Sequence, residues 1–176
     1  MALVSLHCGL RAGEIFSLTL GDLDFENGTM FLRDTKKRRI RTAFMTEEAK
    51  KILQAKAGGE REDLVFPGRD GIKISSISDT FERIVRDLGF NTGITDRRHK
   101  VVFHTLRHTY ASWLIESGVD LYTVKKLMGH STIAMTERYS HLGNNTLQNA
   151  VKGFERYLKE KKVAVVSDSA EKGKVN

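Results

Sequence analysis

Four polar side chains in the second half of the chain could act together on a small anion. His104 and Arg107 are three residues apart, so on a helix they share one face, where an imidazole and a guanidinium can converge on a phosphate. His130 follows Gly129 after a predicted helix end, and a side chain at such a tight turn can reach into a cleft. Tyr139 ends a short polar helix instead of lying in a hydrophobic stripe, which favours a functional tyrosine over a core one. Each residue alone has an ordinary structural explanation, so the prediction depends on their combination.

The elements that must position these side chains follow from apolar periodicity and turn residues. Asn27-Gly28 between apolar runs is a strong hairpin signal. The expected strands cover residues 23–25, 29–33 and 39–45. The expected helices cover residues 2–10, 12–18, 46–57, 76–88, 104–117, 120–128, 132–139 and 145–159. The sequence therefore predicts an α+β fold, mainly helical, with a small three-stranded antiparallel sheet near the N-terminal side.

Two of these helices carry further expectations about caps and burial. Thr46 can cap the helix that follows it. Ser76 with Asp79 resembles a capping box, ahead of an apolar stripe that includes Ile84 and Leu88. Both helices are predicted to belong to the core.

Composition bounds the domain organisation and the partner. The 176 residues carry 29 Lys and Arg against 22 Asp and Glu, and the formal charge of +7 favours a polyanionic partner. Residues 1–160 are predicted to form one globular domain, and residues 161–176 a disordered charged tail. We expect no targeting segment and no membrane span. The single cysteine, Cys8, is expected to be a buried thiol, which suits a reducing cytosol.

Several blocks of the chain resemble the catalytic domain of the tyrosine recombinase (phage integrase-like) family, and they occur in the family's order. The blocks are Gly9-Leu10-Arg11-Ala12-Gly13-Glu14, Thr35-Lys36 with Arg41, His104-Thr105-Leu106-Arg107-His108-Thr109, Leu127-Met128-Gly129-His130-Ser131 and Thr136-Glu137-Arg138-Tyr139. Phe44 stands where the family has a proline, and an upstream DNA-clamping domain is expected to be missing from this chain.

The resemblance implies a phosphoryl-transfer site that works without a cofactor or a metal ion. Arg11 and Arg107 would clamp the scissile phosphate, since a guanidinium donates two parallel hydrogen bonds and keeps its charge. His130 would be a further donor to the phosphate. A metal site is disfavoured because these histidines are interleaved with arginines.

The remaining roles concern the nucleophile and the proton transfers. Tyr139 would attack the phosphodiester and form a 3′-phosphotyrosine. His104 is the candidate base for its proton, and the resemblance assigns protonation of the leaving oxygen to Lys36. Glu14 is expected to orient an arginine, and His108 is expected to point elsewhere on its helix.

The expected function is that of a site-specific DNA recombinase or integrase acting on double-stranded DNA in a prokaryotic cytoplasm, associated with the nucleoid when bound to DNA. By resemblance, a tetramer would form on DNA through the C-terminal helix, and the chain alone would be a monomer with that helix folded back on its own domain. Two alternatives remain open at this point. Residues 120–139 could form a non-catalytic helix-turn-helix, or the enzyme could be like a type IB topoisomerase.

Overall fold

The computed structural model describes residues 1–34, 39–143 and 148–160. Its α-helices are α1 Ala2–Cys8, α2 Ala12–Phe16, α3 Glu47–Gln54, α4 Asp79–Asp87, α5 Phe103–Glu116, α6 Leu121–Met128 and α7 Ala134–Glu137. The strands are β1 Leu23–Asp24, β2 Thr29–Asp34 and β3 Arg39–Phe44, and the short 3-10 helices are η1 Leu20–Asp22, η2 Arg97–His99 and η3 Ser140–Gly143. A further helix spans residues 148–160. The predicted tail, residues 161–176, lies outside the described residues.

The predicted α+β class is confirmed, because one small sheet accompanies these helices. The strands lie in the order β1-β2-β3, and both pairs are antiparallel. Met30, Leu32 and Ala43 point from the sheet into the core, whereas Phe31 and Phe44 are exposed on its other face. This alternation is what a strand with one buried face requires.

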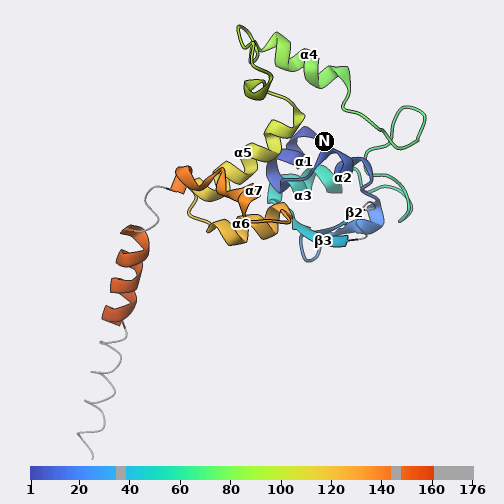
Figure 1. Ribbon diagram of the computed structural model, residues 1–176. Coiled ribbons are helices and arrows are strands. Elements are labelled where there is room, and N and C mark those ends of the chain that lie inside the picture. Colours follow the sequence, from blue (N-terminus) through green and yellow to red (C-terminus); the bar gives the residue numbers. More distant parts are fainter. Residues whose placement is uncertain (35–38, 144–147, 161–176) are drawn as a thin grey trace, which may run out of the picture.

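The core has two parts that meet along α5. The first joins α1, α2, α3 and the inner face of the sheet, and it contains Cys8, which is 1% exposed as predicted. The second is formed by α5 and α6 together with the ring of Tyr139. Figure 1 shows these helices and the sheet gathered in one body. The boundary between the two parts is where the candidate site lies.

Two cap predictions have different outcomes. Thr46 Oγ1 accepts a hydrogen bond from the backbone N–H of Ala49, so the predicted cap of α3 is confirmed. The predicted capping box at Ser76 is wrong, because α4 begins at Asp79 with Ser78 as its N-cap and no side-chain cap bond.

The helix α4 is only partly buried, contrary to prediction. Val85 faces inward, but Ile84 and Leu88 are 49% and 63% exposed. In Figure 1 α4 stands away from the main body, at the end of long connections. An edge-to-face contact between Phe81 and Phe103, with ring centroids 5.4 Å apart, joins it to α5. The apolar stripe of α4 is therefore split between an inner face and solvent.

The helix at residues 148–160 projects from the body in Figure 1. The apolar residues Val151, Phe154 and Leu158 are between 41% and 60% exposed. The prediction that this helix packs on its own domain is thus wrong for this structure. No helix among the described residues is long and apolar enough to cross a membrane.

Candidate active site

Arg107 is the buried centre of the candidate site. Its side chain lies between the two parts of the core and is 1% exposed. One terminal nitrogen donates to the carbonyl of Gly9, at the end of α1, and the other donates to the carbonyl of Met128, at the end of α6. Burial, followed by the charges of Arg11 and Arg41, lowers the pKa of Arg107 to about 9, so it remains a cation at neutral pH.

Three arginines donate hydrogen bonds to the C-terminal end of α6. The last carbonyls of a helix have no partner within the helix and carry its negative dipole end, so they attract cations. Here three consecutive carbonyls each accept a hydrogen bond from a different guanidinium. Leu127 accepts from Arg41 at 3.0 Å, Met128 accepts from Arg107, and Gly129 accepts from Arg11 at 3.3 Å.

Glu14 orients Arg11, as predicted. Its carboxylate accepts from the Arg11 side chain at 3.0 Å and from the Arg11 backbone N–H at 2.7 Å. Burial alone would raise the pKa of this carboxyl, but Arg41 and Arg11 outweigh it and hold the pKa below its ordinary value. The Arg11 side chain stays 38% exposed, so it can still face a ligand in solvent.

His130 is placed by the turn that ends α6. Gly129 has φ of 60°, in the left-handed region, and its N–H and that of His130 close back on carbonyls of the helix. His130 Nδ1 shares a 2.9 Å hydrogen bond with the hydroxyl of Thr136, which is buried. Burial, then Arg107 and Arg11, lower the pKa of His130 to about 4, so the imidazole is neutral at pH 7.

Tyr139 is buried, which the sequence interpretation did not anticipate. It is 5% exposed, and its ring packs with Ala111, Ile115 and Val124 in the second part of the core. Burial raises the pKa of its phenol. The polar neighbours of Tyr139 in the chain therefore say nothing about its surroundings, because the apolar contacts come from α5 and α6.

The hydroxyl of Tyr139 shares a hydrogen bond with His108 Nδ1. The prediction that His108 points elsewhere on its helix is therefore wrong. The ring of His104 makes an edge contact with that of His108, with centroids 4.7 Å apart. Because the two histidines are four residues apart, both lie on one face of α5, and this spacing could have drawn attention to His108.

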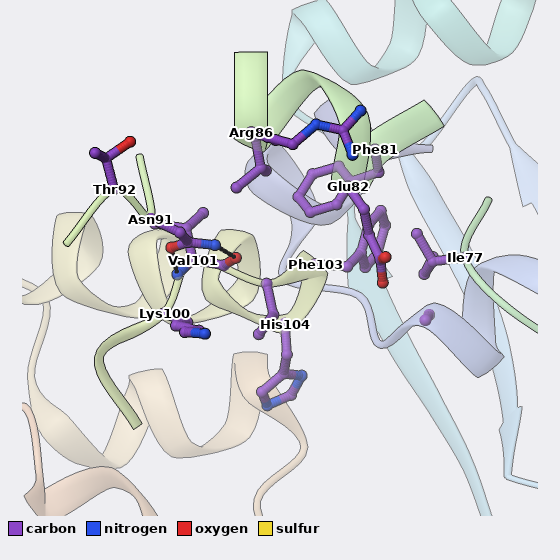
Figure 2. Close-up of a pocket in the computed structure, with 13 residues that line it drawn as sticks. Ile77, Phe81, Glu82, Arg86, Asn91, Thr92, Lys100, Val101, Phe103 and His104 are labelled. Carbon is purple, nitrogen blue, oxygen red and sulfur yellow. Dashed lines mark hydrogen bonds between the residues drawn. The ribbon is translucent and has the colours of Figure 1, made fainter. Parts of the chain in front are cut away.

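His104 lies at the edge of a cavity of about 680 Å³ between α4 and the start of α5. Figure 2 shows its imidazole directed away from Phe81 and α4. Two hydrogen bonds between the Asn91 side chain and the backbone of Val101 hold the connection beside this cavity. Burial, then the charges of Arg107 and Arg11, lower the pKa of His104.

The structure thus brings together five of the six predicted site residues. Arg11, Arg107 and His130 surround the end of α6, while His104 lies on α5 beside the His108–Tyr139 pair. The sixth, Lys36, lies outside the described residues. Within residues 1–34, 39–143 and 148–160, no three His, Cys, Asp or Glu side chains are grouped so that they could hold a metal ion.

The chain is similar to known proteins of one family. Residues 1–146 match the phage integrase family. The tyrosine recombinase XerA of Saccharolobus solfataricus is 35% identical over 145 residues, which cover 82% of this chain and 45% of that protein. The crystal structure of XerA recombinase has a TM-score of 0.63 at 29% identity, covering 87% of this chain and 57% of that one. A variant of the Tn1549 transposon integrase, solved with a circular intermediate DNA, has a TM-score of 0.61 at 26% identity, covering 78% and 52%.

This chain belongs to the phage integrase family, because the family match covers most of its length. It spans about half the length of the curated relatives that it matches. Its structure, mainly helical with one three-stranded sheet, is that of the catalytic domains of tyrosine recombinases.

The three clustered histidines make the stability of the fold depend on pH. Burial lowers the pKa of His104, His108 and His130, in the last case from 6.5 to about 4. Between pH 6.5 and about 4 the unfolded chain therefore binds more protons than the folded protein. The free energy of unfolding thus falls as the pH falls through this range. Thermal unfolding measured across this range should show this loss. His130→Asn should reduce the slope, and equal slopes for the two proteins would contradict the assignment.

Proposed function

We propose that this chain is the catalytic domain of a site-specific DNA recombinase in which Tyr139 breaks a DNA phosphodiester. The observation that carries the proposal is the convergence of Arg11 and Arg107 on the end of α6, next to His130 and a tyrosine whose hydroxyl already contacts an imidazole. The formal charge of +7 supports a polyanionic partner. The Tn1549 integrase structure, which contains DNA, supports duplex DNA as that partner.

In the proposed reaction the phenolic oxygen of Tyr139 attacks the phosphorus, and the bond between phosphorus and the 5′ oxygen breaks. Negative charge accumulates on the non-bridging oxygens, which Arg11, Arg107 and His130 stabilise by hydrogen bonds. The product is a 3′-phosphotyrosine and a free 5′-hydroxyl. Attack by the 5′-hydroxyl of another strand reverses the chemistry, so the phosphodiester energy is conserved and no nucleotide cofactor is consumed.

The proton of Tyr139 needs an acceptor, because burial raises the pKa of the phenol. His104 was the candidate from sequence, whereas His108 holds the hydroxyl in this structure. Since burial lowers the pKa of His108, its ring is neutral at pH 7 and can accept a proton. We therefore propose that His108 accepts the proton of Tyr139, with the ring of His104 in edge contact beside it.

The proposal extends to where the protein acts and how it assembles. The catalytic domain would act in a prokaryotic cytoplasm, associated with the nucleoid when it is bound to DNA. Assembly into a tetramer on DNA would use the helix at residues 148–160, whose apolar residues Val151, Phe154 and Leu158 are exposed. Exposed apolar side chains in one stripe favour a partner surface for this helix.

Two alternatives make different products. A helix-turn-helix formed by α6 and α7 would bind DNA without breaking it, but it leaves the arginines at the end of α6 without a role. A type IB topoisomerase would form the same phosphotyrosine and release relaxed DNA. Only a recombinase joins strands from two duplexes.

The decisive experiment uses a pool of duplexes nicked beside a randomised site. Cleavage there releases a short fragment that diffuses away, so the phosphotyrosine is trapped and survives denaturation. We expect covalent protein–DNA adducts, and sequencing of the trapped DNA would give the recognised site. Joining of two duplexes that carry this site would establish recombination. DNA binding without any adduct would favour the helix-turn-helix, and relaxation of supercoiled DNA without strand joining would favour the topoisomerase.

A prediction for Lys36 follows from its proposed role as the acid for the leaving oxygen. Lys36→Ala should slow cleavage of ordinary DNA but not of DNA whose 5′-bridging oxygen is replaced by sulfur, because a thiolate leaves without a proton. Single-turnover adduct formation on both substrates measures this. Lys37→Ala is the matched control and should behave as wild type. Equal defects of Lys36→Ala on the two substrates would instead assign a positioning role to this lysine.

A further inference from the structure

Arg41 joins three elements of the candidate site through one guanidinium. It lies on β3, and two of its nitrogens donate to the two carboxylate oxygens of Glu14, at 3.1 and 2.8 Å. A third nitrogen donates to the carbonyl of Leu127, at the end of α6, at 3.0 Å. All three nitrogens of the fork are therefore engaged inside the protein. The Arg41 side chain is 18% exposed, against 38% for that of Arg11.

Through Glu14, Arg41 acts on Arg11. The same two carboxylate oxygens that accept from Arg41 also accept from the side chain and the backbone N–H of Arg11. Glu14 is held in one orientation by this set of four hydrogen bonds, and its side chain is only 11% exposed. Because charge-assisted hydrogen bonds with a planar fork fix direction as well as distance, the position of Arg41 determines where Arg11 points.

On its other side, Arg41 packs against the turn that carries His130. A Cβ added to Gly129 would lie 2.5 Å from Cδ of Arg41, so the two are in close contact. Gly129 also has a positive φ, and its carbonyl accepts from Arg11. The backbone of this turn therefore contacts both Arg41 and Arg11.

We propose that Arg41 is a positioning residue for strand cleavage, which fixes Arg11, through Glu14, against the turn that carries His130. The effect on cleavage that this inference predicts rests on the proposed function. The hydrogen bonds that link Arg41, Glu14 and Arg11 are present whether or not the protein cleaves DNA. A lysine at this position would keep the charge, but its single ammonium group cannot donate to both oxygens of Glu14 in a fixed plane and also reach Leu127. Arg41→Lys is therefore the informative variant.

The matched control is Arg33→Gln. Arg33 lies on the neighbouring strand β2 and pairs with the buried Asp22 of η1 at 3.0 Å, so this variant also removes a partner from a buried carboxylate. Both variants would be compared with wild type for melting temperature, for affinity to the trapped DNA site, and for the single-turnover rate of adduct formation.

We expect Arg41→Lys to slow adduct formation by about tenfold or more while its DNA affinity changes by less than about threefold, since positioning affects the transition state more than binding. Arg33→Gln should cleave at the wild-type rate. In an Arg11→Ala background, where the positioned group is gone, Arg41→Lys should add little further loss. Equal losses in both backgrounds, or a wild-type rate for Arg41→Lys, would overturn the proposal.

A measurement on the free protein separates this inference from the proposed function. Arg41→Lys should shift the Nε–H resonance of Arg11 and the amide resonance of His130 in nitrogen-15 spectra, and Arg33→Gln should leave both in place. If Arg41→Lys does not fold, Glu14→Gln breaks the same link from the other side and takes its place in every assay. Unchanged resonances would refute the positioning role even if wild type cleaves DNA. Shifted resonances with no cleavage by wild type would refute the proposed function alone.

Discussion

Tyr139→Phe is expected to form no covalent adduct on DNA that traps the wild-type protein, while its DNA affinity stays nearly unchanged. The substitution removes only the oxygen that would attack the phosphorus. The ring keeps its packing against Ala111, Ile115 and Val124, so the fold should persist. The cost to stability is the hydrogen bond to His108, on the order of 1 kcal/mol. No charge that attracts DNA is altered.

Tyr110→Phe is the matched control for this experiment. Tyr110 also lies on the α5 side of the second part of the core, and its ring is in close contact with Gly9. Removing its hydroxyl should leave adduct formation at the wild-type level. Adducts from Tyr139→Phe in normal yield would mean that another side chain is the nucleophile.

The sequence predicted those features that depend on local patterns. The Asn27-Gly28 turn, the three strands and the cap at Thr46 all follow from residues a few positions apart, and the structure has them. The fold class is confirmed for the same reason. One local prediction failed, the capping box at Ser76. The other failures lie where packing between distant segments decides, as at α4, whose apolar stripe is divided between the core and solvent.

At the site, the environment of Tyr139 also depends on packing between distant segments, so the sequence pattern did not predict it. Helical spacing places both His104 and His108 on one face of α5, but it cannot say which of them meets Tyr139, two residues after the end of α7. Which histidine contacts Tyr139 depends on how α6 packs on α5 and on the direction that the chain takes after the turn at Gly129. The burial of Tyr139 likewise comes from contacts across the core, which the polar neighbours of Tyr139 in the sequence do not reveal.

The second large effect is expected from substitution of Arg107, which should change both the stability of the fold and the rate of DNA cleavage. Arg107 is 1% exposed and donates to the carbonyls of Gly9 and Met128, which belong to the two parts of the core. Arg107→Ala leaves both carbonyls without this donor and opens a cavity, so we expect a loss of about 3–5 kcal/mol in the free energy of unfolding. Denaturant unfolding measures this loss. The alanine variant alone therefore cannot test the role of the cation.

Arg107→Lys separates the two contributions, because it retains most of the side-chain volume and the charge but can no longer donate to both carbonyls from one rigid fork. We expect a smaller loss of stability than for the alanine variant. The single-turnover rate of adduct formation, measured well below the melting temperature, should still fall by about 100-fold or more, since one preorganised donor to the transition state is typically worth that much. DNA affinity should change little, because this side chain contributes almost no surface. A lysine variant that is stably folded and cleaves at the wild-type rate would show that the guanidinium of Arg107 only joins α1 to α6, and the phosphate clamp would then have to be assigned to Arg11 and His130.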